Sequence, residues 1–247
     1  MMVRKVLLAL TAALILAVLG FGAWRFSASA PPRKAAENYV RALAAGDAEA
    51  ALQYSSGSAA FAASRLKGSK VTAKVEDVSC SVAALGRGWA KVLATVELTL
   101  QDGSADVGWY SVDAVKTSQG WKVVSFREAE PDMSGVSGVG LFVNRAEADA
   151  ANRVFQGYLD ALAAGDWQGA AKYLAGPARR SQEMGGAVLG KGAVIGKVEK
   201  LKAKPVWKRG KSMLMRFGYQ VESRDVSVLA GFFRTKQGWR IMKINQI

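Results

Sequence analysis

The sequence predicts an α+β protein in which an N-terminal transmembrane helix precedes two domains, each with helices packed on one side of a curved antiparallel sheet. Three observations support this fold class. The chain begins with a long uncharged apolar stretch, two of its segments recur at an almost constant spacing, and strand-like alternation follows each copy. With 247 residues and 50% hydrophobic content, the chain can bury two cores of ordinary domain size.

The N-terminal stretch, residues 6–24, reads VLLALTAALILAVLGFGAW. It has nineteen residues without a charge, which is long enough to cross a hydrocarbon core as a helix. Arg4 and Lys5 precede it, and Trp24 stands at its outer end, where an interfacial anchor is expected. We therefore expect residues 1–30 to form a single-pass membrane anchor.

A cleaved signal peptide is the alternative, because ASA at 28–30 resembles a cleavage site. Pro31 would directly follow that cut, and the apolar stretch exceeds the usual length of a signal-peptide core, about 7–15 residues. Basic residues flank both ends of the stretch, so the positive-inside rule alone does not set its orientation. Only five residues precede it. We expect the N-terminus to stay inside and both domains to lie outside the cytoplasmic membrane.

The rest of the chain reads as a tandem duplication. RALAAGDAEAALQY at 41–54 recurs as DALAAGDWQGAAKY at 160–173, with an offset of 119 residues. KTSQGWKVVSF at 116–126 recurs as RTKQGWRIMKI at 234–244, with an offset of 118. These echoes predict one domain at 33–128, a second at 146–247, and a Gly/Ser-containing linker at 131–144.

The shared ALAAGD segment predicts a helix end followed by a helix start. Apolar residues at helical spacing lead up to it in both copies. Gly46 and Gly165 stand where a left-handed C-terminal cap is needed, and Asp47 and Asp166 stand where the next helix needs an N-cap. We interpret these residues as structural. Each copy then alternates like strands, in the first copy at 71–80, 92–100, 107–116 and after Gln119, so helix, helix and about four strands are expected.

The pattern YVRALAAGDAEAALQY, followed by strands that close on T-x-Q-G-W-K/R-V/I, resembles the NTF2-like superfamily, in particular the small bacterial extracytoplasmic members that include the DUF4878 type. The resemblance covers roughly residues 33–128 and 146–247 and implies two cone-shaped domains, without specifying an activity. An anchor followed by two such domains is also similar in layout to the TcpC family of conjugation proteins from Gram-positive mobile elements.

NTF2-like enzymes such as ketosteroid isomerase and scytalone dehydratase use a cavity Tyr with Asp or His, so the resemblance leaves an enzyme as one alternative. The chain contains no His, which removes the usual acid–base group near neutral pH. Tyr110 and Asp113 lie three apart on one strand and therefore on opposite faces. The single cysteine, Cys80, reads as a small residue of a half-buried strand. We expect no catalytic residues, cofactor or metal site.

Charge distinguishes the two copies. Residues 31–130 carry 12 basic and 11 acidic side chains, whereas residues 145–247 carry 19 and 8. Within the second copy, one strand and its hairpin are strongly basic, and we predict that they bind an anionic partner through Lys200, Lys202, Lys204, Lys208, Arg209 and Lys211. The first three lysines alternate on one strand face. The alternative is a solvated strand whose lysines keep a sheet edge from aggregating.

Together these features predict a membrane-tethered, extracytoplasmic, non-enzymatic interaction or scaffold protein, as a component of a conjugation or secretion-type envelope complex. The alternatives are a small-ligand-binding NTF2-like protein and a cavity-based isomerase- or dehydratase-like enzyme. The expected partner of the second domain is a protein or an anionic envelope surface. Sequence-specific nucleic-acid binding is not expected, because no recognised DNA-binding motif accompanies the charge. A homo-oligomer is compatible with the sequence.

Overall fold

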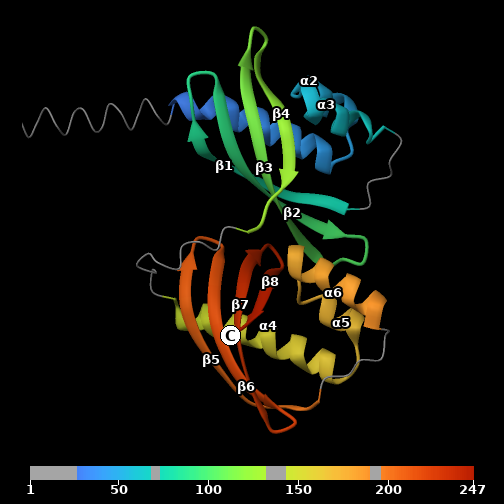
Figure 1. Ribbon diagram of the computed structural model, residues 1–247, viewed down its shortest axis with the longest axis vertical. Helices are drawn as coiled ribbons and strands as arrows, with labels where there is room; N and C mark the ends of the chain where they lie inside the picture. Colours follow the sequence, from blue (N-terminus) through green and yellow to red (C-terminus); the bar gives the residue numbers. More distant parts are fainter. Residues whose placement is uncertain (1–26, 68–72, 132–142, 190–195) are drawn as a thin grey trace, which may run out of the picture. The chain divides into compact units, whose positions relative to one another are not determined.

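The computed structural model describes residues 27–67, 73–131, 143–189 and 196–247 (Figure 1). These residues form two compact units. The first contains the described residues up to 67 together with 78–94 and 110–127, and the second contains 73–77, 95–109 and the described residues from 128 onward. The domain boundaries at 33–128 and 146–247 stay a prediction, and most of the predicted linker at 131–144 lies outside the described residues.

The first unit begins with a helix over residues 27–44, followed by α2 (Ala48–Gln53) and α3 (Gly57–Ser64). Four strands form a sheet in the order β1-β2-β3-β4: β1 (Ala73–Leu85), β2 (Trp89–Leu100), β3 (Ala105–Thr117) and β4 (Gly120–Glu128). Strands joined in sequence by such short loops run antiparallel. The first helix includes Pro31 and Pro32, because proline's fixed φ is close to the helical value.

The second unit contains α4 (Arg145–Ala163), α5 (Trp167–Ala171) and α6 (Gly176–Leu189). Its antiparallel sheet has the order β5-β6-β7-β8, formed by β5 (Val198–Arg209), β6 (Ser212–Val221), β7 (Arg224–Thr235) and β8 (Gly238–Gln246). Helix α4 crosses one face of this sheet (Figure 1). Phe155 of α4 stacks on Phe217 of β6 with ring centroids 3.9 Å apart, at the centre of the core.

The interpretation of ALAAGD is confirmed in both copies. Gly46 and Gly165 have φ values of 73° and 72°, which a residue with a side chain rarely adopts. The carboxylate of Asp47 accepts a hydrogen bond from the Ala50 N–H at 2.9 Å, and Asp166 accepts one from the Gly169 N–H at 2.8 Å. Each aspartate therefore caps the short helix that follows it.

The α+β class is confirmed, but each copy has a third helix that the sequence did not predict. These are α3 and α6. Helix α3 reads GSAAFAAS, and its small residues show no clear separation into apolar and polar faces, while α6 contains glycines at 185 and 186. Helix α3 therefore lacks the periodicity from which a helix is predicted, and the two glycines of α6 disfavour a helix in its second half.

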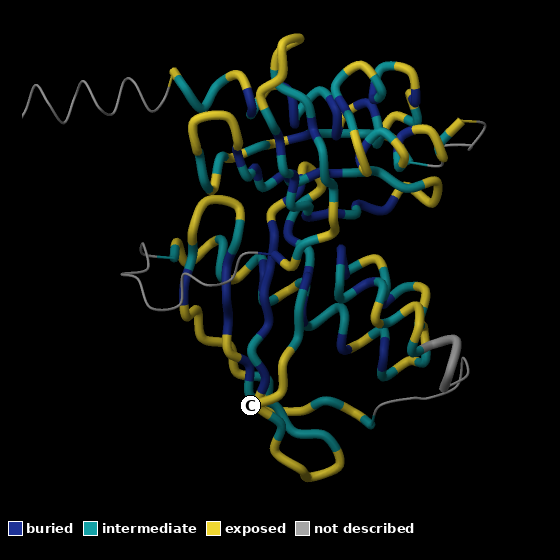
Figure 2. Tube along the Cα trace, turned by 45° about the horizontal axis from the view of Figure 1, so that its top comes forward, coloured by how far each residue is buried: buried dark blue, intermediate teal, exposed yellow. Residues whose placement is uncertain are grey.

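The second unit includes the strand ends 73–77 and 95–109, which contribute to its packing. Trp109 of β3 contacts Phe233 of β7 edge to face, with ring centroids 5.6 Å apart. Gly176 N, at the start of α6, donates a 2.6 Å hydrogen bond to the Asp106 carboxylate. Glu97 of β2 is only 3% exposed, and its carboxylate forms an ion pair with Lys211. Burial is concentrated along the strands and the helix faces against them (Figure 2).

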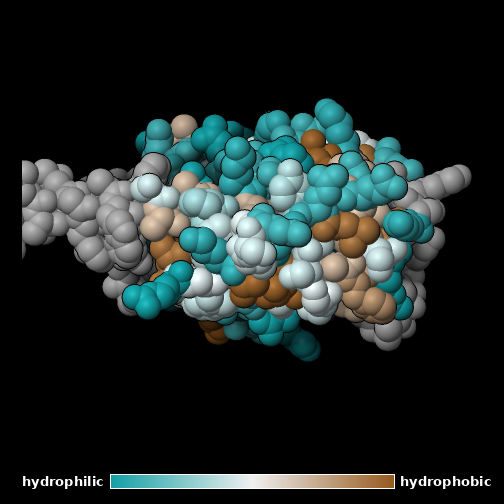
Figure 3. All heavy atoms as spheres, turned by 90° about the horizontal axis from the view of Figure 1, so that it is seen from above, coloured by the Kyte–Doolittle hydropathy of each residue, from teal (hydrophilic) through white to brown (hydrophobic). Residues whose placement is uncertain are grey.

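Hydrophilic side chains cover most of the face drawn in Figure 3, where apolar side chains form separate patches. Few large apolar residues are exposed in the described part of the chain, and they are Phe61, Trp89, Met184, Val206 and Ile247. The predicted membrane anchor, with Arg4, Lys5 and Trp24, lies outside the described residues. Among the helices that are described, none is both long and apolar enough to span a membrane.

Candidate anion-binding surface

The basic strand predicted from the sequence is β5, an edge strand of the second sheet. Trp207 is its only buried residue. Its register with β6 is irregular between Glu199 and Lys202 and again between Pro205 and Trp207. Lys200 lies in the first irregularity with a φ of 56°. The predicted regular alternation of three lysines is therefore interrupted, because a bulge takes Lys200 out of the ladder.

Lys202 and Lys204 remain in register, opposite Gly218 and Arg216 of β6. Cross-strand partners share a sheet face. Phe217 is buried in the core beneath α4, so its neighbours in sequence, Arg216 and Gly218, face the other way. Lys202 and Lys204 therefore lie on the face of the sheet opposite α4, which we call the outer face.

Sequence reasoning missed Arg216. It is exposed on β6, an interior strand, and lies directly opposite Lys204. We call Lys202, Lys204 and Arg216 the basic cluster. All three are exposed, and within the described residues none of them forms a hydrogen bond or ion pair with another side chain. The strand alternation MLMRFGY, with one charge among apolar residues, was the available signal for an outward-facing arginine.

The other predicted residues do not join this cluster. Lys208 pairs with Glu147 of α4 at 2.6 Å, on the opposite face of the sheet. Lys211, in the hairpin, pairs with the buried Glu97 and with Asp77 at 3.3 Å. Arg209 is exposed at the end of β5, opposite Ser212. Anion binding by the six residues stays a prediction, and the geometry brings only Lys202 and Lys204 together on the outer face, with Arg216 beside them.

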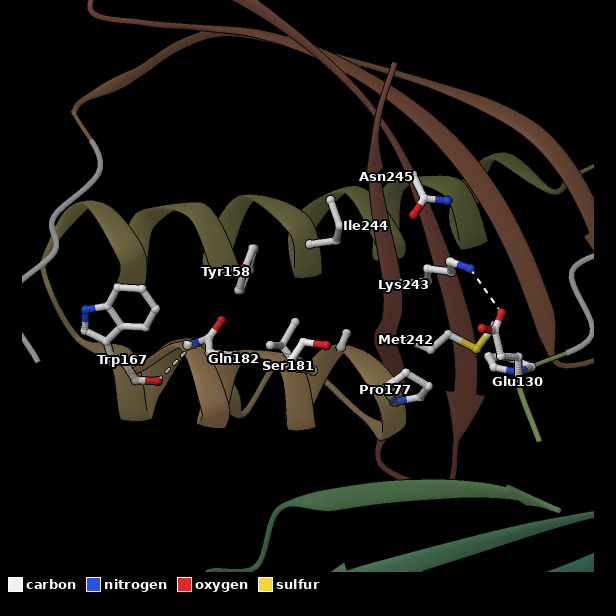
Figure 4. Close-up of a pocket in the computed structure, with 14 residues that line it drawn as sticks. Glu130, Tyr158, Trp167, Pro177, Ser181, Gln182, Met242, Lys243, Ile244 and Asn245 are labelled. Carbon is white, nitrogen blue, oxygen red and sulfur yellow. Dashed lines mark hydrogen bonds and ion pairs between the residues drawn. The ribbon is translucent and has the colours of Figure 1, made fainter. Parts of the chain in front are cut away.

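A groove of about 460 Å³ lies between α4, α6 and β8 of the same unit. Tyr158 of α4 and Ile244 of β8 point into it, with Ser181 and Gln182 of α6 along one side (Figure 4). Burial, with the neighbouring Tyr219, raises the pKa of Tyr158 to about 12. Trp167 also lines the groove, and its indole N–H has no hydrogen-bond partner among the described residues.

The known proteins to which this chain is similar are distant from it. One solved structure, described as an NTF2-like protein involved in plasmid conjugation, is 11% identical with a TM-score of 0.33, over 90% of this chain and 96% of its own. Another, a cystatin-like protein from Ruminococcus gnavus, is 10% identical with a TM-score of 0.27, over 87% of this chain and 76% of its own. No protein-family model and no curated protein matches the sequence. Similarity this low does not indicate a function.

The residues considered above as possible reactive groups, Tyr110, Asp113 and Cys80, lie in structural environments. The Tyr110 ring stacks on Phe126, with centroids 4.6 Å apart. Asp113 forms an ion pair with Arg127 at 3.1 Å. Burial, with a smaller contribution from Glu37, raises the pKa of the Cys80 thiol to about 12. Across the part of the chain that the structure describes, no three His, Cys, Asp or Glu side chains are placed to hold a metal ion.

Proposed function

We propose that this protein is a non-enzymatic, membrane-tethered interaction module that binds an anionic partner outside the cytoplasmic membrane through its basic cluster. The observation that carries the proposal is the position of Arg216, directly opposite Lys204 on the outer face. Like charges in that position destabilise a sheet when nothing neutralises them. An anion bound between them would remove that repulsion.

Edge protection explains the cluster less well than binding does. Lysines on an edge strand discourage pairing with another sheet, and β5 is an edge. Yet two register irregularities already interrupt β5, and Pro205 lacks the N–H that a new strand would need. Arg216 lies on an interior strand, where it protects no edge. The charge on the outer face therefore exceeds what edge protection requires.

The cluster also differs from the other cations of the second unit. Several other basic side chains of this unit form ion pairs with acidic side chains: Arg179 with Glu183, Lys208 and Arg234 with Glu147, Lys236 with Glu76, and Lys243 with Glu130. The basic cluster has no such partner among the described residues. Its charge is available to a binding partner, because exposed charges attract anions at long range.

A binding titration tests the proposal. The full chain in neutral detergent micelles is titrated with polyphosphate at low and high salt, and compared with K204E/R216E and with R145E/R153E. The control reverses two exposed arginines of α4, so both variants change the net charge equally. We expect K204E/R216E to weaken binding at least tenfold and the control to change it less than threefold. Equal loss in both variants would reduce the effect to net charge and reject the surface.

The absence of catalysis belongs to the same proposal. The tyrosine in the groove, Tyr158, has a pKa of about 12 and stays protonated at neutral pH. The groove's one carboxylate, Glu130, pairs with Lys243 at 3.2 Å. A tyrosine with so high a pKa is poorly suited to exchange protons near pH 7.

We also propose that the protein works within a conjugation or secretion-type envelope complex. Support comes from the layout shared with the TcpC family, an apolar N-terminal segment followed by two repeats. Such a complex would supply the anionic protein or envelope surface that the cluster requires. Genes for a conjugation ATPase and a relaxase beside this gene are expected, and an isolated gene in every genome that carries it would contradict this placement.

Small-ligand binding in the groove is the second candidate function. The groove itself favours it, because its volume of about 460 Å³ lies within the range of small-molecule sites, about 300–1,000 Å³, and Tyr158 and Ile244 point into it (Figure 4). Replacing the half-buried Ala178 by Trp should fill the groove. Fragment binding seen by NMR in the unmodified chain and lost in A178W, with polyphosphate binding unchanged, would support this candidate.

A further inference from the structure

Gly218 occupies the middle of β6 on the outer face, next to the basic cluster. It is in register with Lys202 on one side and with Ser227 of β7 on the other, and Arg216 is two residues away on the same strand. A Cβ built at Gly218 would have no atom within 4 Å. The missing side chain therefore leaves an open place on the outer face, bordered by the three basic residues.

The backbone conformation of Gly218 does not require a glycine, because its φ is not among the positive values that favour one. Its register with β7 is regular, and on the other side its partner Lys202 is the first residue of β5 after the bulge at Lys200. A strand-interior glycine is destabilising by roughly 0.5–1 kcal/mol relative to alanine. A glycine inside a strand often marks a bulge, a bend or a place where a ligand approaches closely, and here the bulge lies in β5 and not in β6.

We propose that this place is a subsite for a phosphate group, with Gly218 as its floor and Lys202, Lys204 and Arg216 around it. The inference rests on the proposed function and specifies the chemistry of the anion. Neighbouring strands lie about 4.8 Å apart, so the side chains of Lys202 and Ser227 stand about 10 Å apart across Gly218. A tetrahedral oxyanion fits between them.

The composition of the cluster favours phosphate over carboxylate. A guanidinium group binds two phosphate oxygens with its planar fork, and lysines add point charges from other directions. A carboxylate presents its two oxygens in one plane and is satisfied by one such fork. Three cations around an open floor, with the exposed Ser227 at its edge, match a group whose oxygens point in several directions.

The test places a side chain in the open space above Gly218 without changing the net charge. In G218L the leucine side chain should occupy the subsite, and G185L is the matched control, since Gly185 of α6 also has open space where a Cβ would stand. The full chain in neutral detergent is titrated with polyphosphate and separately with poly-L-glutamate. We expect G218L to weaken polyphosphate binding roughly tenfold, and to leave poly-L-glutamate binding and the unfolding midpoint nearly unchanged.

Each outcome decides one question. Polyphosphate binding that is unchanged in G218L but lost in K204E/R216E would overturn the subsite and leave the proposed function standing. Equal loss of both probes in G218L would overturn the selectivity for phosphate. If G218L does not fold cooperatively, S227L narrows the same place from the neighbouring strand and carries the same expectation. Competition by phosphatidylglycerol in mixed micelles would assign the phosphate to a lipid headgroup, and its absence to a soluble phosphate polymer.

Discussion

Lys204 and Arg216 lie directly opposite each other on neighbouring antiparallel strands, and both side chains are exposed. Opposite charges in this position stabilise a sheet by roughly 0.2–1 kcal/mol, and like charges destabilise it. The free protein thus maintains an arrangement that is unfavourable to its own fold. This relationship links the stability of the second unit to the proposed binding function.

Reversing one charge of this pair should stabilise the protein. K204E would place a carboxylate opposite Arg216, and we expect the free energy of unfolding to rise by about 0.5 kcal/mol at low salt. K204E/R216E restores like charges and should show no such gain. Urea unfolding at two salt concentrations measures both effects. A K204E variant no more stable than the unmodified chain would mean that the two side chains do not interact.

Removing Lys211 should destabilise the second unit. Glu97 is 3% exposed and its Oε2 atom has no partner among the described residues, so K211M would leave a buried carboxylate without its cation. Because Lys211 is itself half exposed, we expect a loss of roughly 1–3 kcal/mol rather than the full value for a buried pair. E97L/K211M should recover part of it. A loss no larger than that of K172M, at an exposed residue of α5's C-terminal end, would refute the pairing.

The same pair predicts a pH dependence at the alkaline end. Burial opposes the charge of Lys211, but the hydrogen bonds and charges of Glu97 and Asp77 outweigh it and raise the pKa above its ordinary value of 10.5. The contribution of the pair is therefore complete below that value and declines as the pH rises through the higher folded-state pKa. The free energies of unfolding of K211M and the unmodified chain should therefore converge as the pH rises from 9 to 12, and a constant difference would contradict the pairing.

Cys80 should be unreactive in the folded chain. Its pKa of about 12 leaves very little thiolate at pH 8, whereas an unperturbed cysteine has a pKa of about 8.5. We expect Ellman's reagent to react at least a hundredfold more slowly with the native chain than with the chain unfolded in urea. Equal rates would place this thiol in contact with solvent.

The N-terminal segment should keep the protein in the membrane fraction. Residues 6–24 are apolar and uncharged, and Pro31 would directly follow the alternative cleavage site. Carbonate-washed membranes should retain the full-length chain, and a protease added outside the cytoplasmic membrane should digest the part after residue 30. A soluble mature chain that starts near residue 31 would contradict the anchor.

Local rules allowed much of the fold to be predicted from the sequence. Gly46 and Gly165 end helices and Asp47 and Asp166 start them through contacts within a few residues, so their spacing alone indicates the structure. Strand alternation likewise depends on near neighbours. Helix α3 was missed because its small residues show no clear apolar face, and α6 because its glycines disfavour a helix. Tertiary packing stabilises both.

The candidate site was only partly predictable, because its geometry depends on partners distant in sequence. From the sequence, Lys208 and Lys211 were expected to be free charges. In the structure they donate hydrogen bonds to the carboxylates of Glu147 and Glu97, which lie 61 and 114 residues earlier. The bulge at Lys200 cannot be seen in an alternating lysine pattern. Arg216 joins the cluster through strand register, which the sequence leaves open until the pairing of β5 with β6 is known.

Two single charge reversals, R216E and R224E, test whether the basic cluster binds the anion. The measured quantity is the affinity of the full chain for polyphosphate at low salt. Both arginines are exposed in the second unit, and each reversal changes the net charge equally, but only Arg216 faces Lys204. We expect R216E to weaken binding roughly tenfold and R224E to change it less than twofold. Equal effects, or no effect of R216E, would contradict the assignment of binding to the basic cluster.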